Sequence, residues 1–225
     1  MMIKGNRNGF GNDKQVVLML HMDGTNGGTT FTDSAYGGRS AKTIDVSGGS
    51  QTSTITYKFA PSSALFDGTG DWISSANSTD WNISAGDWTI DFWGYFASDR
   101  LYHIPFGRER ATAPYPGYYL YYTISDGVVY WITDNNTNRI TTASSSLATD
   151  GWHHLALVCF NGVTTLYIDG VSKGSYTGNP QEEAIALYIG ADPTTFTMKG
   201  YIDEFRFTKG IARWVRNFDV PARAY

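Results

Sequence analysis

The feature that most constrains this chain is the repeated alternation of short apolar or period-two runs with Asp-Gly and Asn-Gly pairs. Such pairs close tight turns, because glycine accepts the positive φ that other residues resist. Among these pairs are those at 67–68, 126–127, 161–162 and 169–170. No segment of helical length shows a 3.6-residue period; at most, residues 211–214 suit one short helical turn. This pattern predicts a large antiparallel β-sandwich.

The clearest single strand is predicted at residues 88–96, where side chains alternate between two faces. The apolar face, which we assign to the core, comprises Trp88, Ile90, Phe92 and Phe96. The other face is polar and aromatic and comprises Thr89, Asp91, Trp93 and Tyr95. That second face suits either a working surface or a face covered by another part of the chain.

Further strands are predicted along the whole chain, among them residues 16–20, 54–59, 64–66, 152–160, 164–168 and 201–207. Residues 117–124 and 128–133 flank a short loop with a glycine, which predicts a hairpin. The chain shows no linker and no internal repeat. We therefore predict one domain over residues 16–225, preceded by a flexible Gly- and Asn-rich arm over residues 1–15.

Charge and composition argue against several partners. The net charge is −4, from 17 Lys and Arg against 21 Asp and Glu, so the chain lacks the positive field that binds nucleic acid. No apolar run reaches the ~18 residues that span a bilayer, so we expect no membrane insertion. The N-terminus is polar and carries no secretory signal, which predicts synthesis in a cytoplasm. Cys159 is the single cysteine, so no intrachain disulfide forms.

Six short motifs follow one another along the chain, and their order carries a family resemblance. They are Leu65-Phe66-Asp67-Gly68, Trp88-Thr89-Ile90-Asp91-Phe92-Trp93, Gly151-Trp152-His153-His154-Leu155, Leu166-Tyr167-Ile168-Asp169-Gly170, Leu187-Tyr188-Ile189-Gly190 and Gly200-Tyr201-Ile202-Asp203-Glu204-Phe205. The series resembles the laminin-G-like family of the concanavalin A-like lectin/glucanase superfamily, over residues 16–221. The resemblance implies an all-β jelly roll of two stacked antiparallel sheets. It does not fix a function, because the same fold carries lectins, adhesion modules, hydrolases and virion parts.

The end of the chain carries a second resemblance. Residues 208–214, followed by Asn217-Phe218 and Pro221, are similar to endings common in bacteriophage proteins of this type. This resemblance implies a virion protein, made in the host cytoplasm.

Catalytic residues are not expected. Retaining glycosidases need two carboxylates roughly 5 Å apart, and related hydrolases place them on a Glu-x-Asp-x-(x)-Glu strand. The glutamates here, Glu109, Glu182, Glu183 and Glu204, lack that spacing. The neighbouring His153 and His154 point to opposite faces of a strand and cannot bind one metal ion together. We therefore predict that the chain is not an enzyme.

A structural calcium ion is a further expectation from the resemblance. In related sandwich proteins such an ion ties the first strand to the last, through an aspartate placed as Asp203 is here. Asp23 or Asp67 could supply further oxygens. The alternative is that Asp203 accepts hydrogen bonds from backbone amides.

Sugar recognition is expected from aromatic faces, which stack on the C–H surfaces of pyranose rings. The candidate ligand-binding residues are Asp91, Trp93, Tyr95, Tyr102, Tyr115, Tyr119, Tyr121 and Trp131, with Asp126, Asn135 and Asn136 as polar partners. The alternative is that most of these aromatics pack between the sheets, since buried Tyr and Trp are common.

These observations give three hypotheses. The first is a non-catalytic, virion-associated module, either a capsid decoration or a tail-fibre protein. It would bind glycans or other virion proteins through its concave sheet. The second is a purely architectural virion subunit, a homo-oligomer whose surface aromatics fill subunit interfaces. The third is a glycoside hydrolase, which the missing paired acids argue against.

Overall fold

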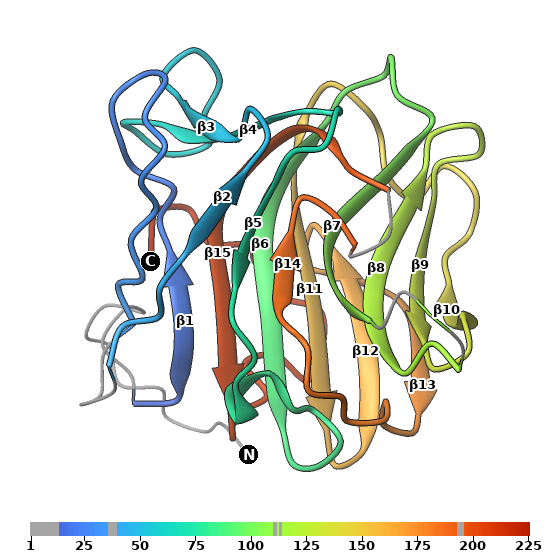
Figure 1. The fold of residues 1–225 in the computed structure, drawn as a ribbon. Coiled ribbons are helices and arrows are strands. Elements are labelled where there is room, and N and C mark those ends of the chain that lie inside the picture. The colour runs from blue at the N-terminus through green and yellow to red at the C-terminus, as the bar shows by residue number, and fades with distance from the viewer. Residues whose placement is uncertain (1–13, 36–39, 110–111, 113, 193–195) are drawn as a thin grey trace.

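Two antiparallel sheets stack face to face in the computed structural model (Figure 1), which describes residues 14–35, 40–109, 112, 114–192 and 196–225. This architecture confirms the predicted all-β, two-sheet sandwich. The predicted arm at residues 1–15 lies almost entirely outside the described residues. Among those residues, no helix has both the length and the apolar character needed to cross a membrane.

Sheet A has the order β13-β12-β11-β6-β15-β4-β3, with β1 added beside β15. Its strands are β1 (Val16–Leu20), β3 (Gln51–Ser53), β4 (Ser63–Asp67), β6 (Trp88–Phe96), β11 (Trp152–Phe160), β12 (Val163–Ile168), β13 (Val171–Thr177) and β15 (Lys199–Lys209). The long β15 organises this sheet. One of its edges pairs with β6, while its other edge pairs with β4 through Tyr201 and Leu65 and with β1 through Phe207 and Leu18.

Sheet B has the order β10-β9-β8-β7-β14-β5-β2. Its strands are β2 (Asp45–Ser47), β5 (Trp72–Ser75), β7 (Tyr102–Glu109), β8 (Gly117–Thr123), β9 (Val128–Thr133), β10 (Thr137–Thr141) and β14 (Leu187–Ile189). The predicted hairpin is confirmed as β8 and β9, with Tyr121 opposite Tyr130. A 3-10 turn, η1 (Thr79–Trp81), lies between β5 and β6.

The core lies between the sheets and is rich in aromatic rings. All four residues assigned to the core face of β6 are buried, which confirms that assignment. The ring of Phe92 lies 5.9 Å from those of Phe106 and Phe205, and Trp88 lies 6.2 Å from Trp131. Burying each such side chain stabilises the fold by about 1.5–3 kcal/mol.

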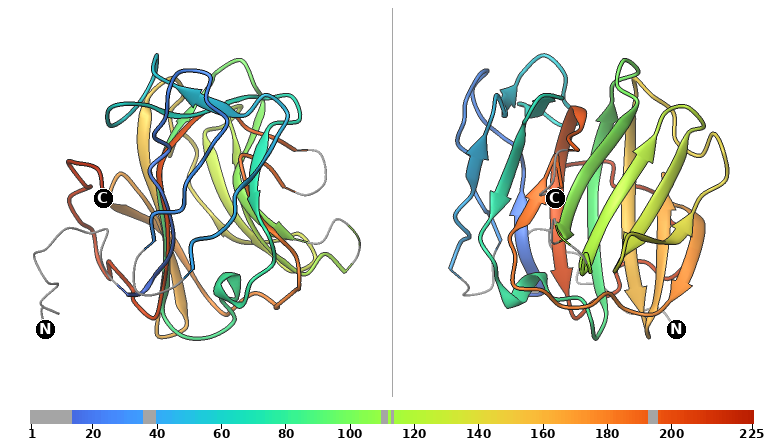
Figure 2. Two further views of the ribbon diagram at one scale, coloured as in Figure 1. Left: turned by 60° about the vertical axis from the view of Figure 1, so that its left-hand side comes forward. Right: turned by 45° about the vertical axis from the view of Figure 1, so that its right-hand side comes forward.

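The C-terminal segment, residues 210–225, returns across the outer face of sheet A. Trp214 and Phe218 stack with ring centroids 4.0 Å apart and pack on Tyr167 and Val158. The left panel of Figure 2 shows the two layers nearly edge-on, with the C-terminus beside sheet A. The segment also covers Thr89 and Asp91 on the polar and aromatic face of β6, while Tyr95 on that face stays half-buried.

Two local predictions are wrong. Residues 211–214 form no helical turn; they are irregular, with a bend at Arg213, and the Arg213 amide donates to Thr89 Oγ1 at 3.0 Å. Residues 54–59 form bends in place of a strand. The backbone amides of Lys58 and Phe59 both donate to Asp203 Oδ2, at 2.9 Å each. These two hydrogen bonds use backbone amides that a strand would donate to a neighbouring strand.

Candidate functional site

The outer face of sheet B carries a hollow of about 390 Å³, which we call the tyrosine pocket. This volume lies in the range of roughly 300–1,000 Å³ typical of small-molecule sites. Its lining residues come from β7, β8, β9 and three adjoining loops. They are Ile104, Glu109, Tyr115, Tyr119, Tyr121, Ile132, Asn136, Asp192 and Phe196.

The alternation of β8 explains why tyrosines line the pocket. Tyr118 and Tyr122 point inward and are 1% exposed, so Tyr119 and Tyr121 point outward. Ile132 on the neighbouring β9 follows the same rule and adds an apolar surface beside them. A run of tyrosines in a period-two strand therefore supplies both core and binding surface.

An aromatic wall continues from the pocket to the loop after β14. Tyr102 stacks on Tyr121 with ring centroids 5.7 Å apart and planes at 23°. Phe196 meets Tyr102 edge-on at 6.4 Å. Tyr102 and Phe196 are 38% and 47% exposed, so the wall presents free ring surface.

Gly107 allows a close approach of two segments beside the pocket. It lies on β7 opposite Tyr119. A Cβ atom at this position would stand 3.0 Å from Tyr119 Cβ and 3.6 Å from the carbonyl oxygen of Ala191. The missing side chain therefore lets the Tyr119 side chain and the loop at residues 191–192 approach each other.

The remaining wall is acidic. The Asn136 amide, turned so that its nitrogen faces its acceptors, donates to Glu109 Oε1 at 3.0 Å and to the Tyr119 hydroxyl at 3.2 Å. Glu109 is 3% exposed. Burial, together with the nearby carboxylates of Asp192 and Asp134, raises the pKa of Glu109 to about 8. Glu109 therefore holds a proton more readily than a solvent-exposed glutamate does.

The loop that supplies Asp192 is held in place by short-range bonds. The backbone amide of Phe196 donates to Asp192 Oδ1 at 3.2 Å, and the Asp192 amide donates to the Phe196 carbonyl at 3.0 Å. Ala191 and Thr197 form an isolated β-bridge. This loop therefore positions an acidic and an aromatic residue together at the pocket.

The structure divides the eight predicted ligand-binding residues into three groups. Tyr115, Tyr119 and Tyr121 line the tyrosine pocket, and Tyr102 stacks beside them. Trp131 is 1% exposed and packs in the core. The other three, Asp91, Trp93 and Tyr95, belong to the outer face of sheet A.

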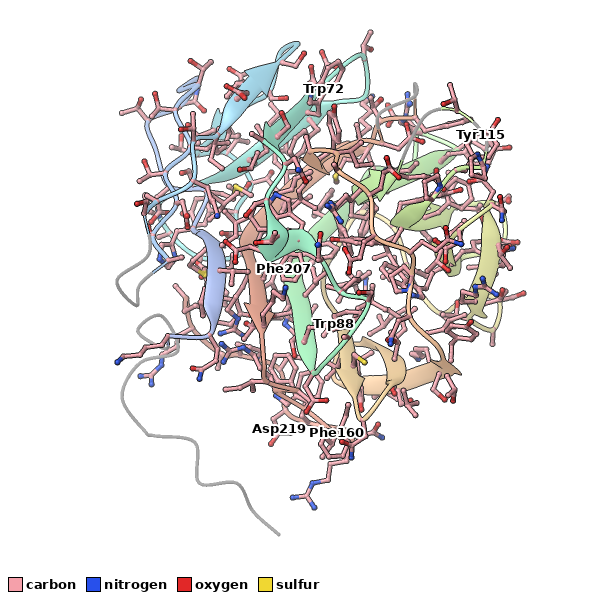
Figure 3. All side chains as sticks on the ribbon, turned by 60° about the horizontal axis from the view of Figure 1, so that its bottom comes forward. Trp72, Trp88, Tyr115, Phe160, Phe207 and Asp219 are labelled. Atoms are coloured by element: carbon pink, nitrogen blue, oxygen red, sulfur yellow. The ribbon has the colours of Figure 1, made fainter. Side chains whose placement is uncertain are left out.

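On that face, Tyr95 joins a half-buried aromatic group with Trp152 and Tyr201, at ring distances of 5.6–5.8 Å from each. Trp93 is 3% exposed, and Lys58 Nζ lies 3.9 Å from its ring centroid. In the view of Figure 3, Tyr115 stands at the opposite edge of the molecule from Phe160 and Asp219. The pocket and the C-terminal segment therefore belong to different faces.

Asp91 is a buried structural group. Arg206 Nε and Nη2 donate to its two oxygens at 3.0 and 2.9 Å, and both side chains are 0% exposed. Tyr225 donates its hydroxyl hydrogen to Asp91 Oδ2, and its ring centroid lies 3.6 Å from Arg206 Cζ. Burial alone would raise the pKa of Asp91, but Arg206 and His154 hold it well below its usual range. The C-terminal segment seals this pair from water.

Sequence reasoning missed five pocket residues: Ile104, Glu109, Ile132, Asp192 and Phe196. Glu109 and Asp192 come together because β14 pairs with β7, a contact between distant parts of the chain. One local signal existed for Ile132, since it alternates with Trp131 on a predicted strand. No local signal marks Asp192.

Of the three predicted calcium ligands, Asp23 lies close enough to Asp203 to raise the pKa of its carboxyl group, whereas Asp67 lies apart from both. Asp203 is 1% exposed, and its Oδ2 accepts two backbone amides, as the alternative interpretation had it. Asp67 pairs with Lys199, four residues before Asp203 and therefore roughly 13 Å away along the strand. Asp23 is exposed and follows β1. In the part of the chain that the structure describes, no group of three or more His, Cys, Asp or Glu side chains is arranged to hold a metal ion. The three predicted ligands therefore do not all meet at one point, and calcium binding stays a prediction.

We therefore expect EDTA to leave the melting temperature unchanged, within about 1 °C. A structural ion that bound only the folded chain would stabilise it by mass action, and its removal would lower the melting temperature. Thermal unfolding with EDTA and with added calcium measures this directly. A clear drop on chelation that calcium reverses would support the calcium hypothesis.

Comparison with known proteins places the chain among lectin-like folds. A family model described as the Concanavalin A-like lectin/glucanases superfamily matches residues 67–211, more than half of the chain. No curated protein sequence matches significantly.

Two solved structures illustrate the likeness. The ligand binding domain of botulinum neurotoxin serotype D, in complex with N-acetylneuraminic acid, matches with a TM-score of 0.61 and 16% identity, over 87% of this chain and 48% of that one. Domain 4 of AbnA, a GH43 extracellular arabinanase from Geobacillus stearothermophilus, in complex with arabinotriose, matches with a TM-score of 0.59 and 19% identity, over 88% of this chain and 94% of that one.

This chain thus spans about half the length of the neurotoxin domain. At such identities the structural likeness establishes the fold alone. The family model, which covers residues in both sheets, establishes the family. The chain belongs to the concanavalin A-like lectin/glucanases superfamily.

Proposed function

We propose that this chain is a non-catalytic carbohydrate-binding module whose ligand lies in the tyrosine pocket. One observation carries the proposal: an aromatic wall and a set of hydrogen-bonding groups meet in one hollow of sugar size. Saccharides need both, because their C–H faces pack on rings while their hydroxyls need buried partners. The solved relatives that hold N-acetylneuraminic acid and arabinotriose support the choice of ligand class.

Replacing Tyr119 or Tyr121 by alanine is expected to weaken glycan binding by about tenfold each, because an aromatic contact of this kind contributes about 0.5–1.5 kcal/mol beyond its buried area. A glycan array, followed by calorimetry on the best hit, measures the change. Tyr201→Ala is the matched control, since this tyrosine is half-buried on the outer face of sheet A. Equal losses from all three variants, or silence of the wild-type chain on the array, would contradict the proposal.

Hydrolysis is a second candidate, favoured by Glu109 and Asp192. A glutamic acid with a raised pKa beside a second carboxylate is the arrangement that glycosidases use for acid catalysis. We favour binding, because the Asn136 amide donates to both Glu109 oxygens, at 3.0 and 3.3 Å. Such hydrogen bonds favour the ionised carboxylate, which cannot act as a catalytic acid. Release of reducing sugars from a polysaccharide panel, abolished by Glu109→Gln, would establish hydrolysis in place of binding alone.

We further propose a virion setting, as a capsid decoration or tail-fibre module. It rests on the resemblance of residues 208–221 to phage protein endings. Mass spectrometry of purified particles tests it, since detection in the particle supports this setting and absence from it counts against it.

An architectural role has one observation in its favour. Phe160, Val163 and Val215 form an apolar group at one end of sheet A, exposed by 41%, 37% and 58%. Light scattering over a range of protein concentrations, together with the glycan array, distinguishes an architectural subunit from a glycan-binding module. A stable oligomer without any glycan hit would favour the architectural subunit.

A further inference from the structure

We propose that Phe10, from the segment that precedes the described residues, docks into an apolar groove on the outer face of sheet A of its own chain. In the view of Figure 3, Phe160 of this groove and Tyr115 of the tyrosine pocket stand at opposite edges of the molecule, so the inference is independent of the proposed sugar site. It follows from the size of the groove, from the reach of the chain and from the sequence around Phe10.

The groove has a volume of about 270 Å³ and lies between two parts of the chain. The β11–β12 hairpin supplies one wall through Val158, Phe160 and Val163. The C-terminal segment supplies the other wall through Trp214 and Val215. Three of these side chains, Phe160, Val163 and Val215, keep much of their apolar surface exposed. Since an apolar cavity of ~150 Å³ already holds a benzene ring, this groove has room for a phenyl side chain.

The chain enters sheet A at the same end as the groove. The Lys209 amide donates to the Gln15 carbonyl at 2.9 Å, next to the start of β1. Lys209 lies opposite Trp88 on β6, and Trp88 lies opposite Cys159 on β11, beside the groove. Gln15 and Cys159 are thus three strand spacings apart, or about 14 Å. The stretch from Phe10 to Gln15 spans up to about 17 Å when extended, so Phe10 can reach the groove.

The sequence around Phe10 suits an apolar anchor. Phe10 is the only apolar side chain between residues 4 and 14, and Gly9 and Gly11 flank it. Glycine lets a backbone approach another surface closely, because it has no Cβ atom. A short tether also keeps Phe10 near the groove at millimolar effective concentration, which a second copy of the chain does not match in dilute solution. The chain's own segment is therefore favoured over a second copy as the occupant.

Trypsin cleavage after Arg7, followed by mass spectrometry, tests the inference. Docking of Phe10 restrains the bond after Arg7, so cleavage there proceeds from the undocked fraction of molecules. Phe160→Ser removes part of the groove and leaves the cleaved sequence unchanged. We expect this variant to be cleaved about fivefold faster or more, because its undocked fraction rises by that factor.

Val171→Ser is the matched control for the groove variant. Val171 is also an exposed apolar residue of sheet A, but it pairs with Ile168 at the end of β12 away from the groove. This variant should change the cleavage rate by less than about twofold, because the docked fraction stays the same.

Nuclear magnetic resonance gives a second measurement, which needs no change in the groove. In the wild-type chain, the Phe10 ring should show nuclear Overhauser contacts to the methyl groups of Val163 and Val215. Phe10→Ala should shift both methyl signals and leave that of Val171 unchanged. Ile3→Ala removes another apolar side chain of the same segment and should leave all three signals unchanged.

The opposite results overturn the inference. Equal cleavage rates in the wild-type chain and in Phe160→Ser would mean that the groove does not hold the segment. Methyl signals that do not respond to Phe10→Ala would show that Phe10 is not its occupant. Contacts that vanish on dilution would show that a second copy supplies the side chain. If Phe160→Ser does not fold, the contacts in the wild-type chain still decide, and a failure of glycan binding bears on the proposed function alone.

Discussion

Replacing Arg206 by methionine is expected to lower the free energy of unfolding by about 3–5 kcal/mol, because it leaves the Asp91 carboxylate buried without its principal partner. Both side chains are 0% exposed and joined by two hydrogen bonds. The pKa of Asp91 is lowered in the folded chain, so the contribution of the pair is present above pH 3.8 and is lost as the pH falls further. The penalty of the substitution should therefore shrink in acid.

Urea denaturation measures the effect, and a double-mutant cycle assigns it to the pair. Asp91→Leu alone should cost a similar amount, whereas Arg206→Met with Asp91→Leu should cost clearly less than the sum. Lys199→Met is the control, because Lys199 and Asp99 form a solvent-exposed pair that should matter little. Additive losses in the cycle would show that the two residues act separately and would contradict the buried-pair interpretation.

The sandwich was predictable because its signals are local. The period of two in residues 88–96 distinguished the core face of β6 without any knowledge of its neighbours. The Asn-Gly and Asp-Gly pairs at 161–162 and 169–170 marked two hairpin turns, where the structure has positive φ at both residues of each pair. A short-range rule suffices for such features.

The strands that sequence reasoning missed lack these signals. β7 contains Pro105 and Gly107, which are both unfavourable in strands, and its pairing with β8 is interrupted by a bulge. β10 has the polar sequence Thr137–Thr141 and is only partly buried. β7 forms because β8 and β14 complete its hydrogen bonds on both sides, and β10 forms at the edge of the sheet by pairing with β9. The information about these partners is not local.

The candidate site could be predicted only in part, for the same reason. Tyr119 and Tyr121 were identifiable because their strand alternates. Asp91, Trp93 and Tyr95 alternate equally well, yet two of them are buried. Tyr225 of the C-terminal segment covers Asp91, whereas Lys58 and Phe59 pack against Trp93. Periodicity in β6 carries no information about either distant segment. Both sheets carry aromatic residues on their outer faces. The C-terminal segment closes the outer face of sheet A to a ligand around Asp91.

Gly170 tests what holds that segment in place. Gly162 and Gly170 occupy the same position in two hairpin turns, with φ of 77° and 74°. A Cβ at Gly162 would meet nothing within 4 Å, whereas one at Gly170 would lie 1.9 Å from the carbonyl oxygen of Phe218. The Phe218 amide also donates to the Gly170 carbonyl at 3.0 Å. The two glycines differ in their contact with the C-terminal segment.

Gly162→Ala should therefore cost only the strain of a left-handed alanine, about 1–2 kcal/mol. Gly170→Ala should cost at least about 2 kcal/mol more, because it must push Phe218 off the sheet and admit water to the buried pair below. Urea denaturation measures the difference, and faster amide exchange in residues 210–225 locates it. Glycan binding should survive Gly170→Ala below the unfolding transition, since the pocket lies on the other sheet. Equal costs for the two alanines would mean that the segment is not held by this contact, and a loss of binding would mean that the two faces are coupled.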